Sequence, residues 1–460
     1  MTRKTTSEQN AIIGWLGNQL VVNVFAGTGK TTTLVQPAEA NQDSKMLCLV
    51  YNSAIRDKAE QQSPLNVEYK TSHQLAWPYF GRHFRSWLTA NLRITDVARK
   101  LNTQYWSLAR LTLTGLNAFL CSAELEPGIV HLPAEDECHG FPADKILGAI
   151  QVLWYEVSRT ESDFLSTHDA YLKLFQHYGP DLSKHRYTIF FDEAQDVNPV
   201  ASAFVLSQPC CIVLIGDRYQ QLCRLQVADN TLSSPRLEQA NRLWLTTSFR
   251  FGPGGAQMAN LQLVMSGEEM KVTDSCEDND VVTYLPANIP PYSVLCRTVF
   301  GVIGAELSAS LQEKKIFWMG GVGGYKMEEL EDLYWFSADM LERMQSPCIR
   351  KDFRDFEEYC TIAKVTLDVE MNQGIRLLGE YFPQPQKRVI MRRQVVTHEK
   401  DAQVTVSTAY RSKGLEWDVV VLNEDFCDIT DPQLYAEERQ DEINLLNVTM
   451  IRVRNILVLN

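Results

Sequence analysis

The stretch Phe25-Ala-Gly-Thr-Gly-Lys-Thr-Thr32 follows the apolar run Val21–Val24 and precedes a segment with helical periodicity. A glycine-rich turn at the start of a helix lets backbone N–H groups wrap around phosphate groups. In such a turn Lys30 is placed to reach the β- and γ-phosphates, and the Thr31 hydroxyl to ligate Mg²⁺. The stretch therefore predicts a nucleotide-binding P-loop made of Ala26, Gly27, Thr28, Gly29, Lys30, Thr31 and Thr32.

The first glycine of the strict P-loop pattern would fall at position 24, where this chain has Val24. Taken alone, the stretch is also compatible with a strand-to-helix turn that carries a lysine by chance. The segment Ile189-Phe-Phe-Asp-Glu-Ala-Gln-Asp196 favours the P-loop, because a P-loop ATPase needs adjacent carboxylates at the end of an apolar strand. Asp192 would hold the Mg²⁺ shell, and Glu193 would orient and deprotonate the attacking water.

The chain has 460 residues, 45% of them hydrophobic, and a formal net charge of −13. This charge excludes a uniformly basic nucleic-acid coat protein, but it leaves room for a local basic channel, because salt confines charge interactions to short range. The eleven cysteines are scattered without a C-x-x-C pair, which favours reduced thiols. With no signal segment and no long apolar run, we expect a cytoplasmic protein without a membrane span, nucleoid-associated in a prokaryote or phage.

Short apolar runs that end in turn residues recur along the chain, at Val21–Phe25, Met46–Tyr51, Thr188–Phe191, Cys211–Ile215 and Val419–Leu422. Continuous apolar runs suit parallel strands that are covered on both faces, so they predict a doubly wound α/β fold. Residues 75–184 and 301–400 are helical in periodicity and are interpreted as two inserted accessory domains. We then expect residues 1–74 and 185–240 to form one α/β domain, and residues 241–300 and 401–460 to form a second.

The motif Asp192-Glu-Ala-Gln-Asp196 resembles the second motif of UvrD/Rep/PcrA-type superfamily 1 helicases, and segments similar to the other motifs follow in the family's order. They are Thr6–Ala11 (the Q motif), Val50–Ala54, Thr71–Ala76, Gly216–Gln221, Thr247–Arg250, Thr408–Asp418 and Asn444–Arg454. Within the superfamily, Phe25–Lys30, Asp169–Leu174 and Val205–Cys210 look closest to the helicase region of F-box DNA helicases. Because the chain begins at the segment that is similar to the Q motif, we expect no F-box.

The resemblance implies two RecA-like domains with helical insertions, and ATP and Mg²⁺ as the nucleotide and metal. It implies catalytic roles for Lys30, Asp192, Glu193, Gln220, Arg250 and Arg452, the two arginines serving the γ-phosphate. It implies nucleotide contacts for Gln9 and Glu416, and metal contacts for Thr31 and Asp192. Contacts to a DNA strand are implied for Tyr51, Asn52, Thr71, His73, Arg297 and Thr298.

Some positions depart from the family pattern. In the stretch Leu222–Ala228, Cys223 stands where an aromatic residue is expected to stack on single-stranded DNA, a contact that contributes about 1–3 kcal/mol per base. Tyr410 replaces a histidine of the fifth motif, and Asn447, Ile451 and Val453 differ in the sixth. Arg454 lies two residues after Arg452, and sequence register favours Arg452 as the catalytic arginine.

Three functions are compatible with these features. The first is an ATP-dependent translocase or helicase that moves 3′ to 5′ on single-stranded DNA, including tailed or forked duplexes, and separates strands or displaces proteins. The second is a nucleotide-gated DNA-binding regulatory subunit that works with a protein partner and unwinds little alone, which the altered motifs and small second insertion favour. The third, a P-loop switch protein that does not bind DNA, is disfavoured by the full motif order.

Overall fold

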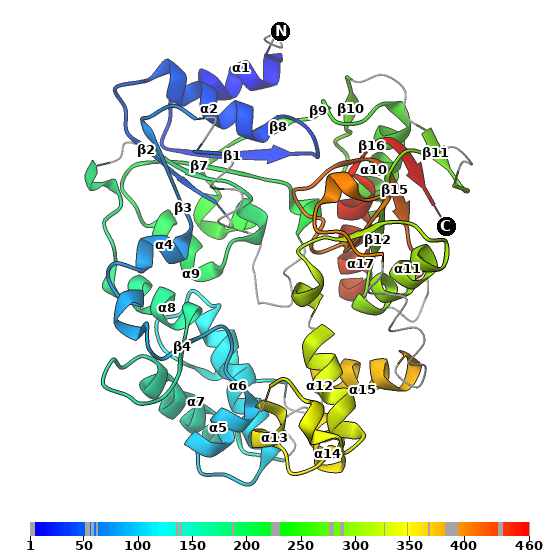
Figure 1. Cartoon of the computed structure of the whole chain (residues 1–460). Helices are drawn as coiled ribbons and strands as arrows, with labels where there is room; N and C mark the ends of the chain where they lie inside the picture. The colour runs from blue at the N-terminus through cyan, green and yellow to red at the C-terminus, as the bar shows by residue number, and fades with distance from the viewer. Residues whose placement is uncertain are drawn as a thin grey trace. The chain divides into compact units, whose positions relative to one another are not determined.

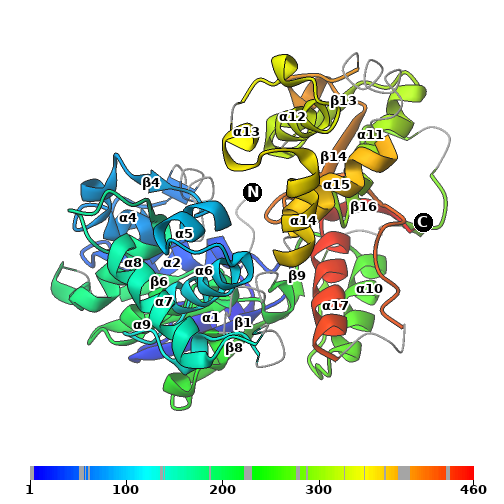
Figure 2. The same cartoon turned by 90° about the horizontal axis from the view of Figure 1, so that it is seen from below.

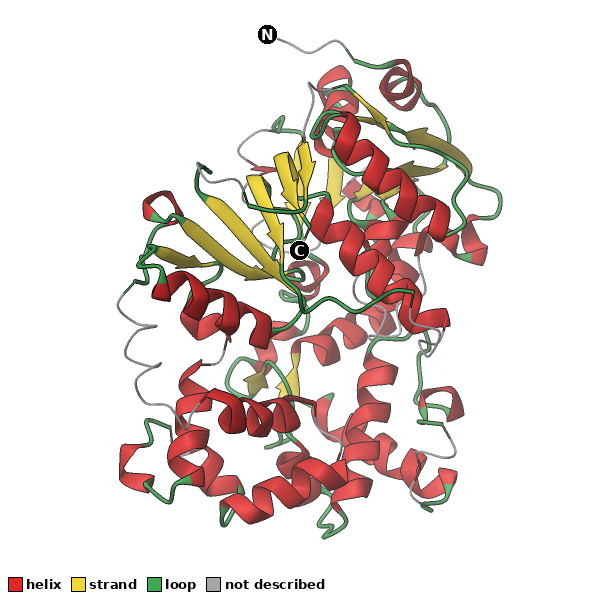
Figure 3. Cartoon of the chain, turned by 90° about the vertical axis from the view of Figure 1, so that its right-hand side faces the viewer, coloured by secondary structure: helices red, strands yellow, loops and turns green. Residues whose placement is uncertain are grey.

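The computed structural model of the chain describes residues 5–50, 56, 59–60, 63–134, 138, 140–185, 188–221, 231–275, 280–285, 289–325, 327–346, 348–366, 369–381, 394–430 and 436–459. None of the helices within these ranges is both long enough and apolar enough to cross a membrane. The chain divides into two units, Met1–Thr247 and Ser248–Asn460, each with its own six-stranded sheet. The strands of each sheet and the helices against them are distinguished by colour in Figure 3.

The first unit is built on a sheet in the order β3-β2-β6-β7-β1-β8, in which neighbouring strands run parallel. The strands are β1 (Gln19–Val24), β2 (Met46–Leu49), β3 (Val67–Lys70), β6 (Thr188–Phe191), β7 (Cys211–Gly216) and β8 (Asn241–Leu245). Four of them coincide with predicted apolar runs, which confirms an α/β fold with parallel strands. All four residues of β2 are buried, as expected of a strand that is covered on both faces.

Alternate residues of these strands enter two different cores. Leu20 and Val22 pack with α1 (Ser7–Ile13) and α2 (Lys30–Ala40), whereas Val21 packs on the opposite face. That face is covered by α4 (Ser72–Ala76), α8 (His168–Tyr178) and α9 (Pro199–Leu206), as Figure 1 shows. The sheet is therefore sandwiched between helices, and its carboxyl edge is left to the loops.

A helical insertion within the first unit has its own hydrophobic core. It contains α5 (Ile94–Lys100), α6 (Trp106–Leu120) and α7 (Ala143–Val157), which lie together in Figure 2. The short pair β4 (Leu88–Thr89) and β5 (Ser166–Thr167) closes its base. Helix α8 contributes Tyr171, Leu172 and Phe175 to the core of the first sheet, although the sequence placed residues 75–184 in the insertion.

The second unit has a sheet in the order β11-β16-β15-β12-β14-β13, again with parallel neighbours. Its strands are β11 (Asp280–Val282), β12 (Tyr292–Cys296), β13 (Ile316–Trp318), β14 (Val404–Thr408), β15 (Trp417–Leu422) and β16 (Val453–Val458). One face packs with α10 (Pro253–Met265) and α17 (Ala436–Met450), and the other with α11 (Val299–Leu311). A two-stranded pair, β9 (Thr247–Ser248) and β10 (Thr273–Asp274), lies beside α10.

Two expected domain boundaries shift for physical reasons. The break between units falls after Thr247 rather than after residue 240, because Asn241–Leu245 pairs with β1 in the first sheet. The second insertion does not begin at residue 301, because β13 pairs with β14 and α11 packs on β12 and β14. The inserted helices are α12 (Met327–Ser337), α13 (Cys348–Asp352), α14 (Phe356–Thr366) and α15 (Val369–Tyr381).

Candidate active site

The predicted phosphate turn connects β1 to α2 in the first unit. Gly27 and Gly29 have φ values of 76° and 78°, in the left-handed region where glycine is favoured. The buried Thr28 hydroxyl donates a hydrogen bond to the carbonyl of Phe25 at 2.9 Å, which closes the turn. Thr31 lies in the first turn of α2, but its side chain is outside the described atoms, whereas Thr32 is exposed. Val24, in place of glycine, is the last residue of β1 and is buried against Leu34 and Leu245 in one cluster.

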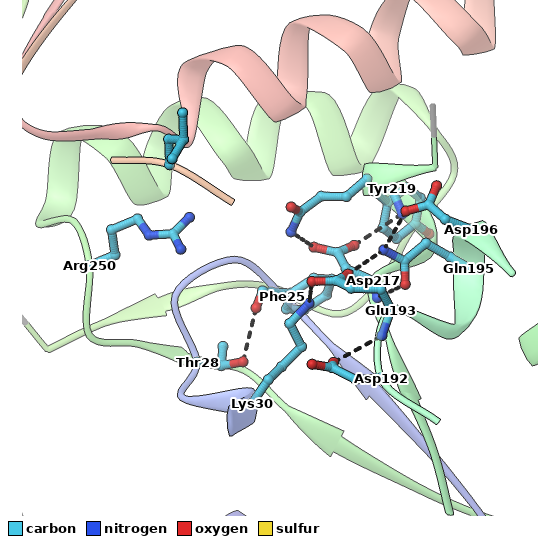
Figure 4. A network of polar contacts seen from close by, with 12 residues as sticks. Phe25, Thr28, Lys30, Asp192, Glu193, Gln195, Asp196, Asp217, Tyr219 and Arg250 are labelled. Atoms are coloured by element: carbon cyan, nitrogen blue, oxygen red, sulfur yellow. Dashed lines mark hydrogen bonds and ion pairs between the residues drawn. The ribbon is translucent and has the colours of Figure 1, made fainter. Parts of the chain in front are cut away.

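Lys30 reaches the acidic turn that follows β6. Its Nζ atom lies 2.5 Å from Oε1 of Glu193, and both side chains are largely buried (Figure 4). Burial lowers the pKa of Lys30, but the charges of Glu193, Asp192 and Asp217 outweigh it, so the net pKa is raised. The lysine therefore stays protonated and is the positive charge of this site.

Glu193 adopts a left-handed backbone conformation, with φ of 53°, which is uncommon for a residue other than glycine. Asp192 precedes it, and its Oδ1 accepts the Glu193 N–H at 2.9 Å, while the Asp192 N–H donates to the carbonyl of Leu49. These bonds hold the two carboxylates at the carboxyl edge of the sheet. Strained backbone of this kind clusters at functional sites.

Burial raises the pKa of Asp192 to about 6, although the charge of Lys30 opposes the rise. Burial likewise raises the pKa of Asp217 to about 6, against the hydrogen bond from Gln220. The Gln220 Nε2 donates to Asp217 Oδ2 at 2.6 Å. Burial thus makes the ionised forms of Asp192 and Asp217 unfavourable. Added positive charge beside these two groups would stabilise their ionised forms.

Gln195 links the two acidic segments. Its Nε2 donates to Oε2 of Glu193 at 2.6 Å, and its Oε1 accepts the N–H of Asp217 at 3.0 Å (Figure 4). A Cβ atom on Gly216 would lie 2.4 Å from that Oε1, so a larger residue would displace the Gln195 side chain. No role was predicted for Gln195 or Asp217, although both lie inside motifs quoted from the sequence. Their side chains connect two distant segments, and such a contact leaves no recognisable pattern in the sequence of either segment.

Gln9 lies in α1, beside the first turn of α2. Its Nε2 donates to the hydroxyl of Thr33 at 3.2 Å, and its Oε1 accepts the N–H of Thr6. Thr33 in turn donates to the carbonyl of Gly29, the residue that caps α2. This chain of contacts places Gln9, for which a nucleotide contact is predicted, beside the phosphate turn.

The residues present fit a magnesium ion. Asp192, Glu193 and Asp217 bring three carboxylates to one lysine, which leaves an excess of negative charge. Among the described residues, no group of three or more side chains forms a complete metal site. A magnesium ion at this place would be held by one or two of these carboxylates together with water and phosphate oxygens, as is usual for Mg²⁺.

Of the predicted strand contacts in the first unit, Tyr51 and Asn52 lie outside the described residues. Thr71 caps α4 and is nearly buried, its hydroxyl accepting the N–H of Gln74. His73 places Nε2 3.3 Å from Oδ1 of Asp169, and its ring meets those of His168 and Tyr171. His73 remains partly exposed, and Thr71 acts locally as a helix cap.

In the second unit Arg250 is held by two partners. Its Nη2 lies 2.6 Å from Oε1 of Glu416, and its Nη1 donates to the carbonyl of Ile451 at 3.0 Å. Arg454 contacts the other oxygen of Glu416 at 3.3 Å. Burial raises the pKa of Glu416, but the charges of Arg250 and Arg454 lower it by more than burial raises it. The net pKa is therefore lowered, and this carboxylate stays ionised. Arg250 and Glu416, predicted from separate motifs, are thus brought together.

Arg452 and Arg454 differ sharply in environment. Arg452 is 2% exposed, and its Nε donates to the carbonyl of Val448 at 2.8 Å. The Arg454 side chain is 50% exposed and contacts Asp418 as well as Glu416. Arg452, directly before β16, is therefore buried, whereas Arg454, within the strand, is half exposed.

Arg297 and Thr298 are both engaged by carboxylates. The Arg297 guanidinium forms a bidentate pair with Glu442, with Nη2 2.5 Å and Nε 2.9 Å from its oxygens. Asp425 accepts the N–H of Arg297 and both the N–H and the hydroxyl of Thr298, at 2.7–3.0 Å. Acidic side chains thus bind Arg297 and Thr298, the two residues for which the sequence predicted contacts to DNA.

The stretch Leu222–Ala228, which departs from the family pattern, lies outside the described residues. After α4, Trp77 and Phe80 pack against the core of the first sheet, whereas Tyr79 is half exposed.

No family model matches the chain. It is 28% identical over 504 aligned residues to F-box DNA helicase 1 of Gallus gallus, and 29% identical over 514 to F-box DNA helicase protein 1 of Schizosaccharomyces pombe. The alignments cover 99% and 100% of this chain but 49% and 58% of the relatives, so the chain spans about half their length. The predicted resemblance to F-box DNA helicases is thereby confirmed over nearly the whole chain.

Among solved structures, a helicase of PRRSV matches 96% of this chain and 51% of its own, with a TM-score of 0.32 and 11% identity. At that level of similarity it does not bear on the fold.

Proposed function

We propose that the chain is an ATP-hydrolysing DNA helicase or translocase, built on two RecA-like units, that moves 3′ to 5′ on single-stranded DNA. The observation that carries this proposal is the cluster of Lys30, Glu193, Asp192 and Asp217 beside the glycine turn. A buried lysine among carboxylates, next to a helix N-terminus, is suited to a phosphate chain with a bound cation. The likeness to DNA helicases supports DNA as the polymer.

The roles of the residues follow from their chemistry. Backbone N–H groups from Gly27 to Lys30 would bind the phosphates, and Lys30 would neutralise them. Asp192 and the Thr31 hydroxyl would hold Mg²⁺, which when bound offsets charge on the phosphate oxygens. Glu193, released from Lys30 as the lysine turns to phosphate, would accept the proton of the attacking water.

We propose Arg250 and Arg452 as the cations that stabilise negative charge on the transferring γ-phosphoryl group. Gln220, fixed by Asp217, would orient the same group. Hydrolysis of ATP with and without single-stranded DNA tests the assignment. We expect DNA to stimulate turnover in the wild type, and the stimulation to be lost in Arg452→Ala; strand displacement on a tailed duplex tests unwinding. Absence of stimulation in the wild type would contradict a coupled motor.

A second candidate is a regulatory subunit that binds nucleotide and DNA but unwinds little without a protein partner. The engagement of Arg297 by Glu442, and of Thr298 by Asp425, favours it, because these groups are not free to contact a strand. ATP binding without DNA-stimulated turnover would support this candidate.

A further inference from the structure

Residues 69–95 contain no aspartate or glutamate, although the chain has 57 acidic residues and a net charge of −13. The same stretch contains Lys70, Arg82, Arg85 and Arg93. It runs from β3 through α4 and a 3₁₀ turn, η1 (Gly81–Phe84), to α5. This segment is locally positive although the whole chain is acidic. Its exposed side chains indicate the class of ligand that it can bind.

Two tyrosines form an exposed pair at this surface. The rings of Tyr79 and Tyr178 lie 5.5 Å apart between centroids, and the residues are 50% and 60% exposed. Phe175 contacts the ring of Tyr79 at 5.2 Å, and Phe80 contacts that of Tyr178 at 6.1 Å. Figure 1 shows α4 beside α8, the helix that ends at Tyr178. The packed phenylalanines hold the tyrosines in place, so these rings are presented to solvent at little cost in conformational entropy.

Arg82, within η1, and Arg85, directly after it, are both exposed to solvent. Gly81 and Phe84 are buried, whereas Arg82 and Arg85 are exposed. Side chains three residues apart are eclipsed in a 3₁₀ turn, which places Arg82 and Arg85 on one side. Trp87 follows, 44% exposed, with its backbone N–H bonded to Phe84 and its carbonyl to Ser166. Two exposed arginines thus lie between two exposed aromatic residues along one short segment.

We propose that Tyr79, Arg82, Arg85, Trp87 and Tyr178, here named the tyrosine–arginine surface, bind single-stranded DNA as a contact separate from Thr71 and His73. Bases stack on exposed rings without regard to sequence, and arginines pair with the phosphates between them. Exposed rings that flank arginines match the succession of bases and phosphates along a single strand. The inference rests on the proposed function and adds a second region of strand contact to it.

The first experiment measures binding of fluorescent oligo(dT) by the full chain. We expect the double variant Tyr79→Ala/Tyr178→Ala to bind on the order of tenfold more weakly, and Tyr79→Phe/Tyr178→Phe to bind as the wild type does, because the rings remain. The matched control is Tyr155→Ala on α7. Tyr155 is 56% exposed and Arg159 lies 4.7 Å from its ring, but Glu156 and Glu161 are its neighbours in sequence. We expect no change in this control.

The second experiment measures how binding depends on salt. Each phosphate contact to a single strand contributes about −0.7 to the slope of log K against log salt. Arg82→Gln and Arg85→Gln should each reduce the slope by about that amount, whereas Arg159→Gln should leave it unchanged. Both arginines are exposed, so the glutamine variants retain the packing of Phe84, and a loss of affinity with an unaltered slope would overturn the proposal.

DNA-stimulated ATPase separates this inference from the proposed function. If the surface binds DNA, its variants will need more oligo(dT) for half-maximal stimulation but will keep the basal and maximal rates. If the wild type shows no stimulation, the motor assignment fails, whereas oligo(dT) binding that depends on the tyrosine pair still supports the surface. Unchanged affinity in both the tyrosine and the arginine variants would overturn the surface and direct attention to an acidic protein partner.

Discussion

Lys30 and Glu193 are 163 residues apart in the sequence, yet their side chains meet at 2.5 Å. The strand order explains the contact, because β7 lies between β6 and β1, so the turns that follow β6 and β1 emerge at the same edge of the sheet. Parallel α/β sheets place ligand sites at this carboxyl edge. The lysine thus pairs with the carboxylate that we propose as the general base.

Replacing Lys30 by Ala should abolish ATP turnover, with a loss of at least about 10²-fold, because the charge on the transferring phosphate loses its partner. Nucleotide binding should weaken as well, measured with a fluorescent ATP analogue. Lys100→Ala is the matched control: Lys100 pairs with Glu156 at 2.8 Å in the helical insertion, so it also removes one lysine from a lysine–glutamate pair. Near-normal ATPase in Lys30→Ala would overturn the P-loop assignment.

Glu193→Gln should keep nucleotide binding and lower hydrolysis by about 10²–10⁴-fold, because glutamine cannot accept the proton of the attacking water. Glutamine is isosteric with glutamate but has one acceptor oxygen in place of two, so it can keep the hydrogen bond from the Nε2 of Gln195 while it loses the ion pair with Lys30 (Figure 4). Single-turnover hydrolysis and ATP-analogue affinity distinguish the two effects, with Glu156→Gln as control. Loss of binding equal to the loss of hydrolysis would assign Glu193 a structural role.

Arg250→Ala and Arg452→Ala should each lower DNA-stimulated ATPase by about 10³-fold or more, the range known for arginines that act on a γ-phosphate. Arg454→Ala should have little effect, because its exposed contacts to Glu416 and Asp418 contribute little free energy. Arg452→Lys keeps the charge but not the planar fork, and should also be impaired. If Arg454→Ala is inactive and Arg452→Lys is active, the register assignment is wrong.

The sequence predicted the strands best where both of their faces are buried. Cys211–Ile215 and Thr188–Phe191 were recognised as strands because covered parallel strands carry continuous apolar residues. Asn241–Leu245 was assigned to the wrong unit, since its exposed start and mixed composition do not show which sheet it joins. An apolar pattern predicts that a segment forms a strand, but it does not predict which strand the segment pairs with.

The residues of the candidate site also differ in how well the sequence predicted them. Lys30, Asp192 and Glu193 were predicted because glycine turns and strand-end carboxylates have local signatures. The partner of Arg297 was not, because Glu442 lies 145 residues away and no spacing links the two. Pairing between distant segments depends on topology, which the motifs alone do not specify.

The second unit contains a carboxyl group that the proposed chemistry does not use. Glu306, in α11, is completely buried; its Oε1 accepts the hydroxyl of Ser310 at 2.8 Å, and its Oε2 has no hydrogen-bond partner within the described part of the chain. Burial raises its pKa to about 7, although the hydrogen bond from Ser310 opposes the rise. Ionising this group inside the protein is therefore costly.

The stability around α11 should accordingly fall as the pH rises. The folded carboxyl binds its proton with a pKa of about 7, whereas the unfolded one does so near 4.3, so between these values folding is linked to proton uptake. Glu306→Gln, which is neutral at every pH, should match the wild type near pH 4 and exceed it by about 3–4 kcal/mol above pH 8. Hydrogen exchange of α11 peptides in the full chain, measured from pH 5 to 9 and corrected for intrinsic rates, reports this local stability. Ser310→Ala should enlarge the pH effect, because it removes the donor to the ionised form. A stability difference between Glu306→Gln and wild type that does not change with pH would show that the carboxyl does not titrate in this range.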